Sequence, residues 1–458
     1  MSQFKPYPAY QDSGVEWLGE VPKHWMLTPI KHLALLNPRK SGFAGDTEQL
    51  CSFVPMEKLK TGVVQLDEER PIEEVIGGYT YFEDGDVLQA KVTPCFENKN
   101  IAIAKGLTNG IGFGSSEINV LRPCQGVTAE YLYYRLQEDS YMSFCSSNMI
   151  GAGGLKRVPT DVINNFKVAA PELFEQTQIS RFLDHETARI DALIEEQQRL
   201  IELLKEKRQA LISHAVTKGL DPAVPMKDSR VEWLAEVPAH WAVAPTSYRY
   251  EIQLGRMLNE HRAQGEHLKP YLRVLDVQWN SINTSDLPLM DFPPDAQLMY
   301  RLKNGDLLVN EGGSYVGRSA IWRGDLDECY YQKALHRLRA RDAKSDTAEF
   351  FLYVMEMATQ RGVFIAGGNQ TTIDHLTAEQ LRQYRFAFPP LKEQLQIAEF
   401  ISKEASKISN TTSEAENLIV LLQERRSALI SAAVTGKVDV RGWQPPASVS
   451  SPKLEETV

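Results

Sequence analysis

Two long segments of this chain, residues 172–216 and 393–434, repeat apolar residues at helical spacing and contain neither proline nor glycine. The expected seam of each segment advances in alternating steps of four and three residues, which is the heptad spacing of paired helices. At about 1.5 Å per residue, each helix would be on the order of 65 Å long, too long for the core of one small domain. The seam positions are Ile179, Leu183, Glu186, Ile190, Leu193, Leu204, Lys207 and Leu211 in the first segment, and Ile401, Glu404, Ile408, Leu418, Leu422, Arg425 and Leu429 in the second.

The two predicted helices are expected to pair with each other. A parallel pair in register would set Glu186 against Glu404 and Lys207 against Arg425, so that like charges face each other. An antiparallel pair can set Glu186 against Arg425 and Lys207 against Glu404. The charges therefore favour an antiparallel coiled coil.

The rest of the chain also occurs twice. The pattern D-S-x-V-E-W-L-x-E-V-P-x-H-W occupies residues 12–25 and again residues 228–241. Such self-similarity indicates repeated structural units. We predict an α+β protein in which two mixed α/β domains alternate with the two long helices. The ranges are 1–171 for the first domain, 172–216 for the first helix, 217–227 for a linker, 228–390 for the second domain, 391–435 for the second helix and 436–458 for a disordered tail.

Local patterns give a coarse reading of both domains. Alternating runs at 101–104, 117–121 and 334–339 predict strands, and residues 131–136 and 349–357 predict helices. Gly85-Asp-Val-Leu and Gly305-Asp-Leu-Leu are expected to be matching turns that feed apolar strands. The tryptophans of the repeated segment, at positions 17, 25, 233 and 241, are expected to be packing anchors rather than binding aromatics.

Composition excludes several classes of protein. The 458 residues are 43% hydrophobic, which is enough to build a core in each of two or three domains. No run approaches eighteen apolar residues and the first twelve residues do not resemble a signal peptide, so we expect a cytoplasmic protein without a membrane partner. The five cysteines form no C-x-x-C pair, which favours reduced thiols over disulfides or a zinc site. A net charge of −10 argues against uniform nucleic-acid coating, so any phosphate contacts must be local.

Catalytic motifs are absent from the sequence. It contains no G-x-x-x-x-G-K-[ST] phosphate loop, no H-E-x-x-H metal motif and no G-x-S-x-G nucleophile motif. An N-P-P-[FY] motif for adenine methylation and a nuclease carboxylate cluster are also absent. We therefore expect a chain that is non-catalytic by itself and binds no cofactor or metal.

In this arrangement the chain resembles the specificity subunit of type I restriction-modification systems. The resemblance covers essentially the whole sequence and depends on several motifs in duplicate order. They are the repeated D-S-x-V-E-W-L-x-E-V-P-x-H-W segment, T-P-C-F-E-N at 93–98, G-D-L-L-V-N-E-G-G at 305–313, E-Q-x-Q-I at 175–179 and 393–397, and L-I-S-x-A-V-T at 211–217 and 429–435.

The resemblance implies that each domain is a target-recognition domain that reads one part of a split sequence in double-stranded DNA. It also implies that the helices set the gap and dock two methyltransferase (M) subunits, which restriction (R) subunits join. S-adenosylmethionine, ATP and Mg would then be bound by those partners. A rod that carries two unlike heads is physically suited to a bipartite site, because each head contacts DNA only where the rod places it.

Candidate DNA contacts in the second domain lie in two stretches. On a strand, the cations of residues 333–341 would share one face and could grip phosphates or guanine. The glycine-rich loop at 310–318 offers amide, carboxylate, hydroxyl and guanidinium groups. A solvated edge strand and a plain turn are the alternatives. The residues are Lys333, Arg337, Arg339 and Arg341 on the strand, and Asn310, Glu311, Ser314, Tyr315 and Arg318 on the loop.

The first domain has a comparable loop at residues 91–100, although loops of this composition are often only solvated. Its candidates are Lys91, Thr93, Asn98, Lys99 and Asn100, since Asn can pair with adenine and Lys with guanine or phosphate. Two further glycine-rich stretches precede the long helices. They contribute Lys156 and Arg157 in the first domain, and Asn369 and Gln370 in the second.

Two other functions fit the same sequence. A coiled-coil scaffold whose heads bind proteins would suit the acidic total charge and would show no salt-dependent affinity for DNA. A specificity subunit from an orphaned or methyltransferase-only system would have the same sequence features, and its neighbouring genes would distinguish it.

Overall fold

The computed structural model describes residues 5–40, 45–152, 154–257, 263–364 and 375–446. It contains two compact units, Met1–Gln197 with Asn417–Val458, and Gln198–Glu416. The division falls inside both long helices, so each unit combines one globular domain with a part of each helix. The sequence-based domain ranges instead assigned each helix to a segment of its own. No described helix is long and apolar enough to cross a membrane.

The first domain is built on two four-stranded sheets. One has the order β11-β10-β13-β4 and the other β8-β5-β12-β9. Their strands are β4 (Ala34–Leu36), β5 (Leu50–Val54), β8 (Glu69–Pro71), β9 (Thr80–Glu83), β10 (Val87–Ala90), β11 (Ile101–Ile103), β12 (Ile111–Gly114) and β13 (Ile118–Pro123). The helices are α1 (Ile72–Val75), α2 (Ala129–Arg135), α3 (Asp139–Ser147) and α4 (Thr160–Asn165).

The second domain repeats this plan. Its sheets have the orders β20-β28-β25-β26 and β24-β21-β27. The strands are β20 (Tyr250–Leu254), β21 (Leu268–Leu272), β24 (Leu289–Asp291), β25 (Leu307–Asn310), β26 (Ser319–Ile321), β27 (Tyr330–Tyr331) and β28 (Leu335–Ala340). The helices are α6 (Thr246–Arg249), α7 (Pro294–Tyr300), α8 (Ala348–Gln360) and α9 (Ala378–Gln383). The strands and helices expected from local patterns are confirmed by β11, β13, β28, α2 and α8.

The repeated Gly-Asp turns have the same structural role in both domains. Asp86 is 2% exposed and accepts two hydrogen bonds from the Arg122 guanidinium, each at 2.8 Å. Asp306 is 1% exposed and accepts two from Arg339, each at 2.6 Å. A buried carboxylate needs such a partner, because an unpaired charge in the core is strongly destabilising. The turn and its arginine are therefore one unit of the fold, present twice.

Both long helices are continuous. Helix α5 runs over Leu173–Lys218 and α10 over Leu391–Val434, within two residues of the predicted ends. In the first unit Arg426 forms a 3.0 Å ion pair with Asp191, and Gln178 donates to the carbonyl of Val440. In the second unit Lys207 lies close enough to help lower the pKa of Glu404, after the larger effect of Lys407. The helix segments of each unit thus run antiparallel, as their charges predicted.

In α5 the predicted heptad register fails beyond Ile190, whereas in α10 the predicted seam residues Ile401, Ile408, Leu422 and Leu429 are buried as expected. Leu193 and Leu418 are 46% and 42% exposed, and Lys207 and Arg425 are exposed, while Leu204 and Leu211 are only half-buried. Glu186 bonds to Arg189 of its own helix. The buried isoleucines of α5 recur every eleven residues, at 179, 190, 201 and 212, whereas in α10 the buried residues Ile401, Ile408, Ala415, Leu422 and Leu429 recur every seven. An α-helix has 3.6 residues per turn, so eleven residues are about three turns and this repeat keeps one face of α5 buried.

The repeated His-Trp pair holds each domain to the first turn of a helix. Trp25 and His24 bond to the Glu175 carboxylate at 3.1 and 2.8 Å. The corresponding residues of the second unit, at positions 241 and 240, bond to Glu393 at 3.0 and 2.8 Å. Trp25 and Trp241 are 2% and 1% exposed. The predicted packing role of these tryptophans is confirmed.

The segment after α10 packs against the first domain, which differs from the predicted disordered tail. Val438 and Val440 are buried, and the backbone N–H of Asp439 donates to the carbonyl of Lys5. Trp443 contacts Phe182 of α5 edge-on, with ring centroids 5.3 Å apart. These apolar residues gain free energy from burial although their sequence neighbours are polar. Residues 447–458 lie outside the described part of the chain.

Candidate nucleic-acid interface

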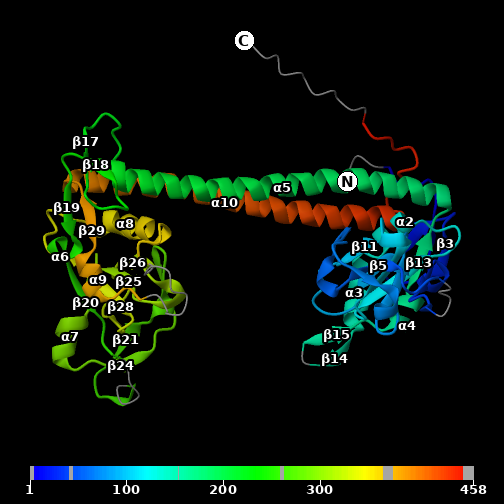
Figure 1. Cartoon of the computed structure of the whole chain (residues 1–458), viewed down its shortest axis with the longest axis horizontal. Helices are drawn as coiled ribbons and strands as arrows, with labels where there is room; N and C mark the ends of the chain where they lie inside the picture. The colour runs from blue at the N-terminus through cyan, green and yellow to red at the C-terminus, as the bar shows by residue number, and fades with distance from the viewer. Residues whose placement is uncertain (1–4, 41–44, 153, 258–262, 365–374, 447–458) are drawn as a thin grey trace, which may run out of the picture. The chain divides into compact units, whose positions relative to one another are not determined.

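An exposed hairpin and a neighbouring loop form the candidate surface of the first domain. Strands β14 (Ile150–Ala152) and β15 (Leu155–Arg157) are exposed throughout, and they project on the side of the domain away from α5 and α10 (Figure 1). The backbone N–H of Thr93 donates to the carbonyl of Lys156 at 3.0 Å, and its hydroxyl donates to the carbonyl of Gly154 at 2.8 Å. The structure thus brings Lys91, Thr93, Lys156 and Arg157 together, as a joint site requires.

A basic cleft adjoins this hairpin. It has a volume of about 570 Å³, and its lining includes Arg39, Lys40, Tyr79 and Lys91. Arg39 is exposed and forms no ion pair with any described residue, whereas the Lys40 ammonium donates to the carbonyl of Ile76 at 2.7 Å. Cations that line an open cleft are suited to phosphate contacts. Sequence reasoning missed both basic residues, although the Arg-Lys pair directly after a strand and a proline was a usable signal.

Arg157 is held by a neighbouring acid. Its guanidinium donates two hydrogen bonds of 2.8 Å to Glu117, and these bonds lower the pKa of that carboxyl. Both side chains remain partly exposed, so the pair is available to a ligand as a preorganised donor and acceptor. The hydrogen bonds fix the direction in which the arginine points.

The other candidates of residues 91–100 do not join this surface. The Lys99 ammonium donates to Asp139 at 3.1 Å and to Ser427 of α10 at 2.9 Å, so it ties the domain to a helix. Asn98 is exposed, but its carbonyl and that of Lys99 accept from the Thr61 hydroxyl. Asn100 is half-buried and its backbone pairs with Ala90 and Cys95. The sequence-based prediction placed these residues with Lys91 because they are close in the chain. The loop turns back on itself and directs them elsewhere.

The arginine strand of the second domain is not an open basic face. Arg337 is 2% exposed and donates to Glu251 at 2.7 Å, and Arg339 is bound to Asp306. Alternation along β28 does place both on one face, but that face meets acids from neighbouring strands and turns. Lys333 is exposed, and so is Arg341, whose Nε donates to the carbonyl of Ser247 at 2.8 Å.

The candidate residues of the loop at 310–318 also fall into two groups, one buried with a structural role and one exposed or half-buried. Asn310 is fully buried and donates to the carbonyl of Val274, so it has a structural role. Glu311 is half-buried, Tyr315 is 41% exposed, and the Arg318 guanidinium lies 4.4 Å from the centre of the Tyr315 ring and bonds to Gln278. The side chain of Ser314, together with Asn369 and Gln370, lies outside the described residues.

Glu311 has an unusual environment. Burial raises the pKa of its carboxyl, and the nearby His375 and Lys333 oppose that effect. No described residue donates a hydrogen bond to its side chain. A half-buried acid with unused acceptor capacity is suited to accept a hydrogen bond from a ligand.

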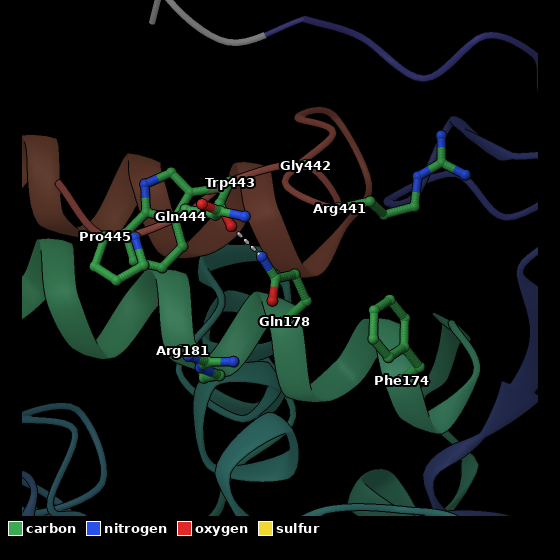
Figure 2. A pocket seen from close by; sticks show the side chains of 8 residues that line it. All are labelled: Phe174, Gln178, Arg181, Arg441, Gly442, Trp443, Gln444 and Pro445. Carbon is green, nitrogen blue, oxygen red and sulfur yellow. Dashed lines mark hydrogen bonds between the residues drawn. The ribbon is translucent and has the colours of Figure 1, made fainter. Parts of the chain in front are cut away.

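A second pocket lies where the tail meets α5. It has a volume of about 480 Å³, and Figure 2 shows Gln178 reaching from α5 toward the segment that carries Trp443, with Phe174 and Arg181 along the same helix. Arg441 also lines it and bonds to Asp439. Its eight lining residues include no Ser, Cys or His that could act as a nucleophile or a base. No cluster of metal-ligating side chains occurs among the residues that the structure describes.

Comparison with known proteins agrees with this fold. Residues 277–419 match the family model described as "Type I restriction modification DNA specificity domain". The "Type I restriction enzyme EcoEI specificity subunit" of Escherichia coli is 37% identical over 163 residues, which cover 35% of this chain and 27% of that protein.

Two solved structures share the fold over nearly the whole chain. A structure entitled "Structural basis underlying complex assembly and conformational transition of the type I R-M system" has a TM-score of 0.68 at 18% identity, and covers 90% of this chain and 98% of its own. The HsdS subunit from Thermoanaerobacter tengcongensis has a TM-score of 0.56 at 16% identity, with coverages of 91% and 98%. These two structures show the shared fold. The resemblance to specificity subunits inferred from the duplicated motifs is confirmed by the family model and the Escherichia coli relative.

Proposed function

We propose that this chain is a DNA sequence-specificity subunit of a type I restriction-modification enzyme, and that each domain reads one part of a split target. One observation carries the proposal: two domains of the same sheet plan and the same helix anchor present different side chains at equivalent loops. Lys91, Lys156 and Arg157 belong to the first domain, and Glu311 and His375 to the second. A duplicated scaffold with unlike contact residues is what two different half-sites require.

Affinity and specificity come from different groups in this proposal. Arg39 and Lys156 contact phosphates and position the first domain, while Lys91, which also lines the cleft, is available to contact a base edge in the major groove. Because the chain has a net charge of −10, its own phosphate contacts are confined to local basic patches. Partner subunits supply a large share of the remaining phosphate contacts.

Catalysis belongs to other chains in this proposal. The chain docks two methyltransferase subunits and joins restriction subunits, and those partners bind S-adenosylmethionine, ATP and Mg. The long helices set the number of bases between the two half-sites.

The test is co-expression of this chain with the methyltransferase encoded beside it, followed by single-molecule sequencing of host DNA for methylated adenines. We expect one split motif, with two defined parts around a fixed run of unspecified bases. If the complex forms and marks DNA without a split motif, the proposal fails. If no complex forms and the purified chain shows no salt-dependent affinity for DNA, the protein-binding scaffold takes its place.

A further inference from the structure

Lys91 and Glu311 occupy the same backbone position in the two domains. In the first domain, Ala90 of β10 pairs with Ile118 of β13, and in the second domain Asn310 of β25 pairs with Leu335 of β28. Lys91 and Glu311 are the next residues after these pairs. Because both sheets have the same strand order and direction, these two residues leave equivalent strands at equivalent points.

The hydrogen bonds around the two residues support this equivalence. The N–H of Lys91 donates to the carbonyl of Glu117 at 2.9 Å, and the N–H of Glu311 donates to that of Ala334 at 3.0 Å. The carbonyl of Lys91 accepts from Val158 at 2.9 Å, and that of Glu311 accepts from Leu376 at 2.6 Å. One residue further, the bridge Val92–Arg157 matches the bridge Gly312–His375. The backbone is therefore the same, and only the side chain differs.

The side chains at this position carry opposite charges. Lys91 lines the basic cleft with Arg39, and its ammonium forms no ion pair with a described residue. Glu311 faces Lys333 and His375 but accepts no hydrogen bond from a described residue. Neighbouring positions differ as well, since Glu117, which holds Arg157, corresponds to Ala334.

We propose that this shared position determines specificity in both domains, with Lys91 reading a guanine in one half-site and Glu311 reading a cytosine in the other. The inference depends on the proposed function. The guanine edge in the major groove presents the acceptors O6 and N7, which suit an ammonium, and cytosine presents its N4 amino group, which suits a carboxylate. Both side chains emerge from a rigid strand end, so a one-base change in the DNA alters a single hydrogen-bonded contact.

The experiment uses the assembled complex and duplexes that carry the split motif mapped for the unchanged protein. Each half-site base is replaced in turn, and affinity is measured at one salt concentration for the unchanged chain, Lys91→Ala, Lys91→Arg and Glu311→Ala. For the unchanged chain, replacing one guanine in one half-site and one cytosine in the other should each lower affinity by about tenfold or more. For Lys91→Ala, the affinities for duplexes with each of the four bases at the guanine position should agree within about threefold. Lys91→Arg should retain the preference for guanine. Both variants should discriminate at the other half-site as the unchanged chain does. Glu311→Ala should relax only the cytosine position.

Several results would overturn the inference. If Lys91→Ala weakens binding to every duplex by the same factor, the residue contacts phosphate and does not read a base. Unchanged discrimination in both alanine variants, or loss of all binding in both Lys91→Ala and Lys91→Arg, would also refute it. If the unchanged complex discriminates between no duplexes, the proposed function itself fails, which distinguishes the two failures.

Discussion

At the scale of single residues, whether an arginine is available to bind a ligand depends on whether an acidic side chain lies beside it. Arg339 and Arg341 are two positions apart, yet Arg339 is bound to the buried Asp306 and Arg341 is exposed. Sequence alone ranked both as candidate DNA contacts. The matching pair of Arg122 with Asp86 in the first domain identifies the arginine as part of the repeated fold.

Removal of the Arg339 guanidinium should destabilise the second domain without a specific effect on base reading. Arg339→Ala leaves Asp306 buried and unpaired, which should lower the free energy of unfolding by about 3 kcal/mol. Arg341→Ala is the matched control and should cost less than about 0.5 kcal/mol, because it removes an exposed side chain. Thermal denaturation of both variants measures the difference, and equal losses would refute the assignment.

His336 should make the second domain sensitive to acid. It is fully buried, and burial lowers its pKa from 6.5 to about 4. The unfolded chain therefore binds the proton first as the pH falls, so this contribution is fully present above pH 6.5 and is lost progressively toward pH 4. Between pH 7 and pH 5 the loss should be about 2 kcal/mol.

The first domain suggests a suitable replacement for His336, because Asn119 occupies the equivalent strand position there. The measurement is the midpoint of unfolding in urea between pH 7 and pH 5. This midpoint should change less with pH in His336→Asn than in the unchanged chain. If the variant and the unchanged chain lose stability in parallel, another group titrates.

At the scale of elements, each long helix begins with an acid that holds its domain, and the two anchors differ in strength. The side chain of Glu175 is 6% exposed and also accepts from the Tyr7 hydroxyl at 2.6 Å, whereas that of Glu393 is 25% exposed and has no matching tyrosine contact among the described residues. This asymmetry follows from the segment at 5–12, which packs beside the tail.

Loss of the first anchor should therefore cost more than loss of the second. We expect Glu175→Ala to lower the free energy of unfolding of its unit by about 3 kcal/mol, because three donors lose their acceptor, and Glu393→Ala to cost about half as much. Hydrogen exchange at the first turns of α5 and α10 reports each unit separately. The reverse order of effects would contradict the buried-anchor assignment.

The eleven-residue repeat of α5 gives a second test at this scale. Ile190 is 5% exposed and Leu193 46%. Ile190→Ala should cost about 3 kcal/mol through the cavity that it leaves, and Leu193→Ala less than about 1 kcal/mol. The heptad register, in which both positions face the partner helix, predicts similar losses.

At the scale of the whole molecule, the number of helical turns removed determines which deletions the two helices tolerate. Removal of residues 191–201 together with 411–421 takes eleven residues, about three whole turns, from each helix, so the flanking residues keep nearly the same face. With the proposed methyltransferase partners, we expect the complex of this variant to methylate DNA with both half-sites retained and fewer unspecified bases between them. Methylation mapping measures that gap.

A nine-residue deletion from each helix is the control. Nine residues are about two and a half turns, so the stripe would continue on the opposite face and the helices should not pair. An unchanged gap after the eleven-residue deletion would show that the helices do not set the spacing.

The sequence by itself determined the features that depend on local pattern and on repetition. Helix length follows from the absence of proline and glycine, the twofold organisation follows from the repeated motifs, and the antiparallel direction follows from charges such as Lys207 and Glu404. The tryptophan anchors were predicted correctly as well, because the same segment occurs before both domains. Each of these features can be read along the chain without knowing which distant residues meet.

Only the tertiary structure decided which polar groups remain free to bind. Arg337 is buried against Glu251, and Lys99 is tied to Asp139 and Ser427, and in each case the partner is distant in sequence. The seam of α5 needed the structure too, since Leu193 is 46% exposed only three residues after the buried Ile190. The shared position of Lys91 and Glu311 appears only when the two sheets are aligned strand by strand, because it is defined by hydrogen bonds across the sheet and not by a common motif.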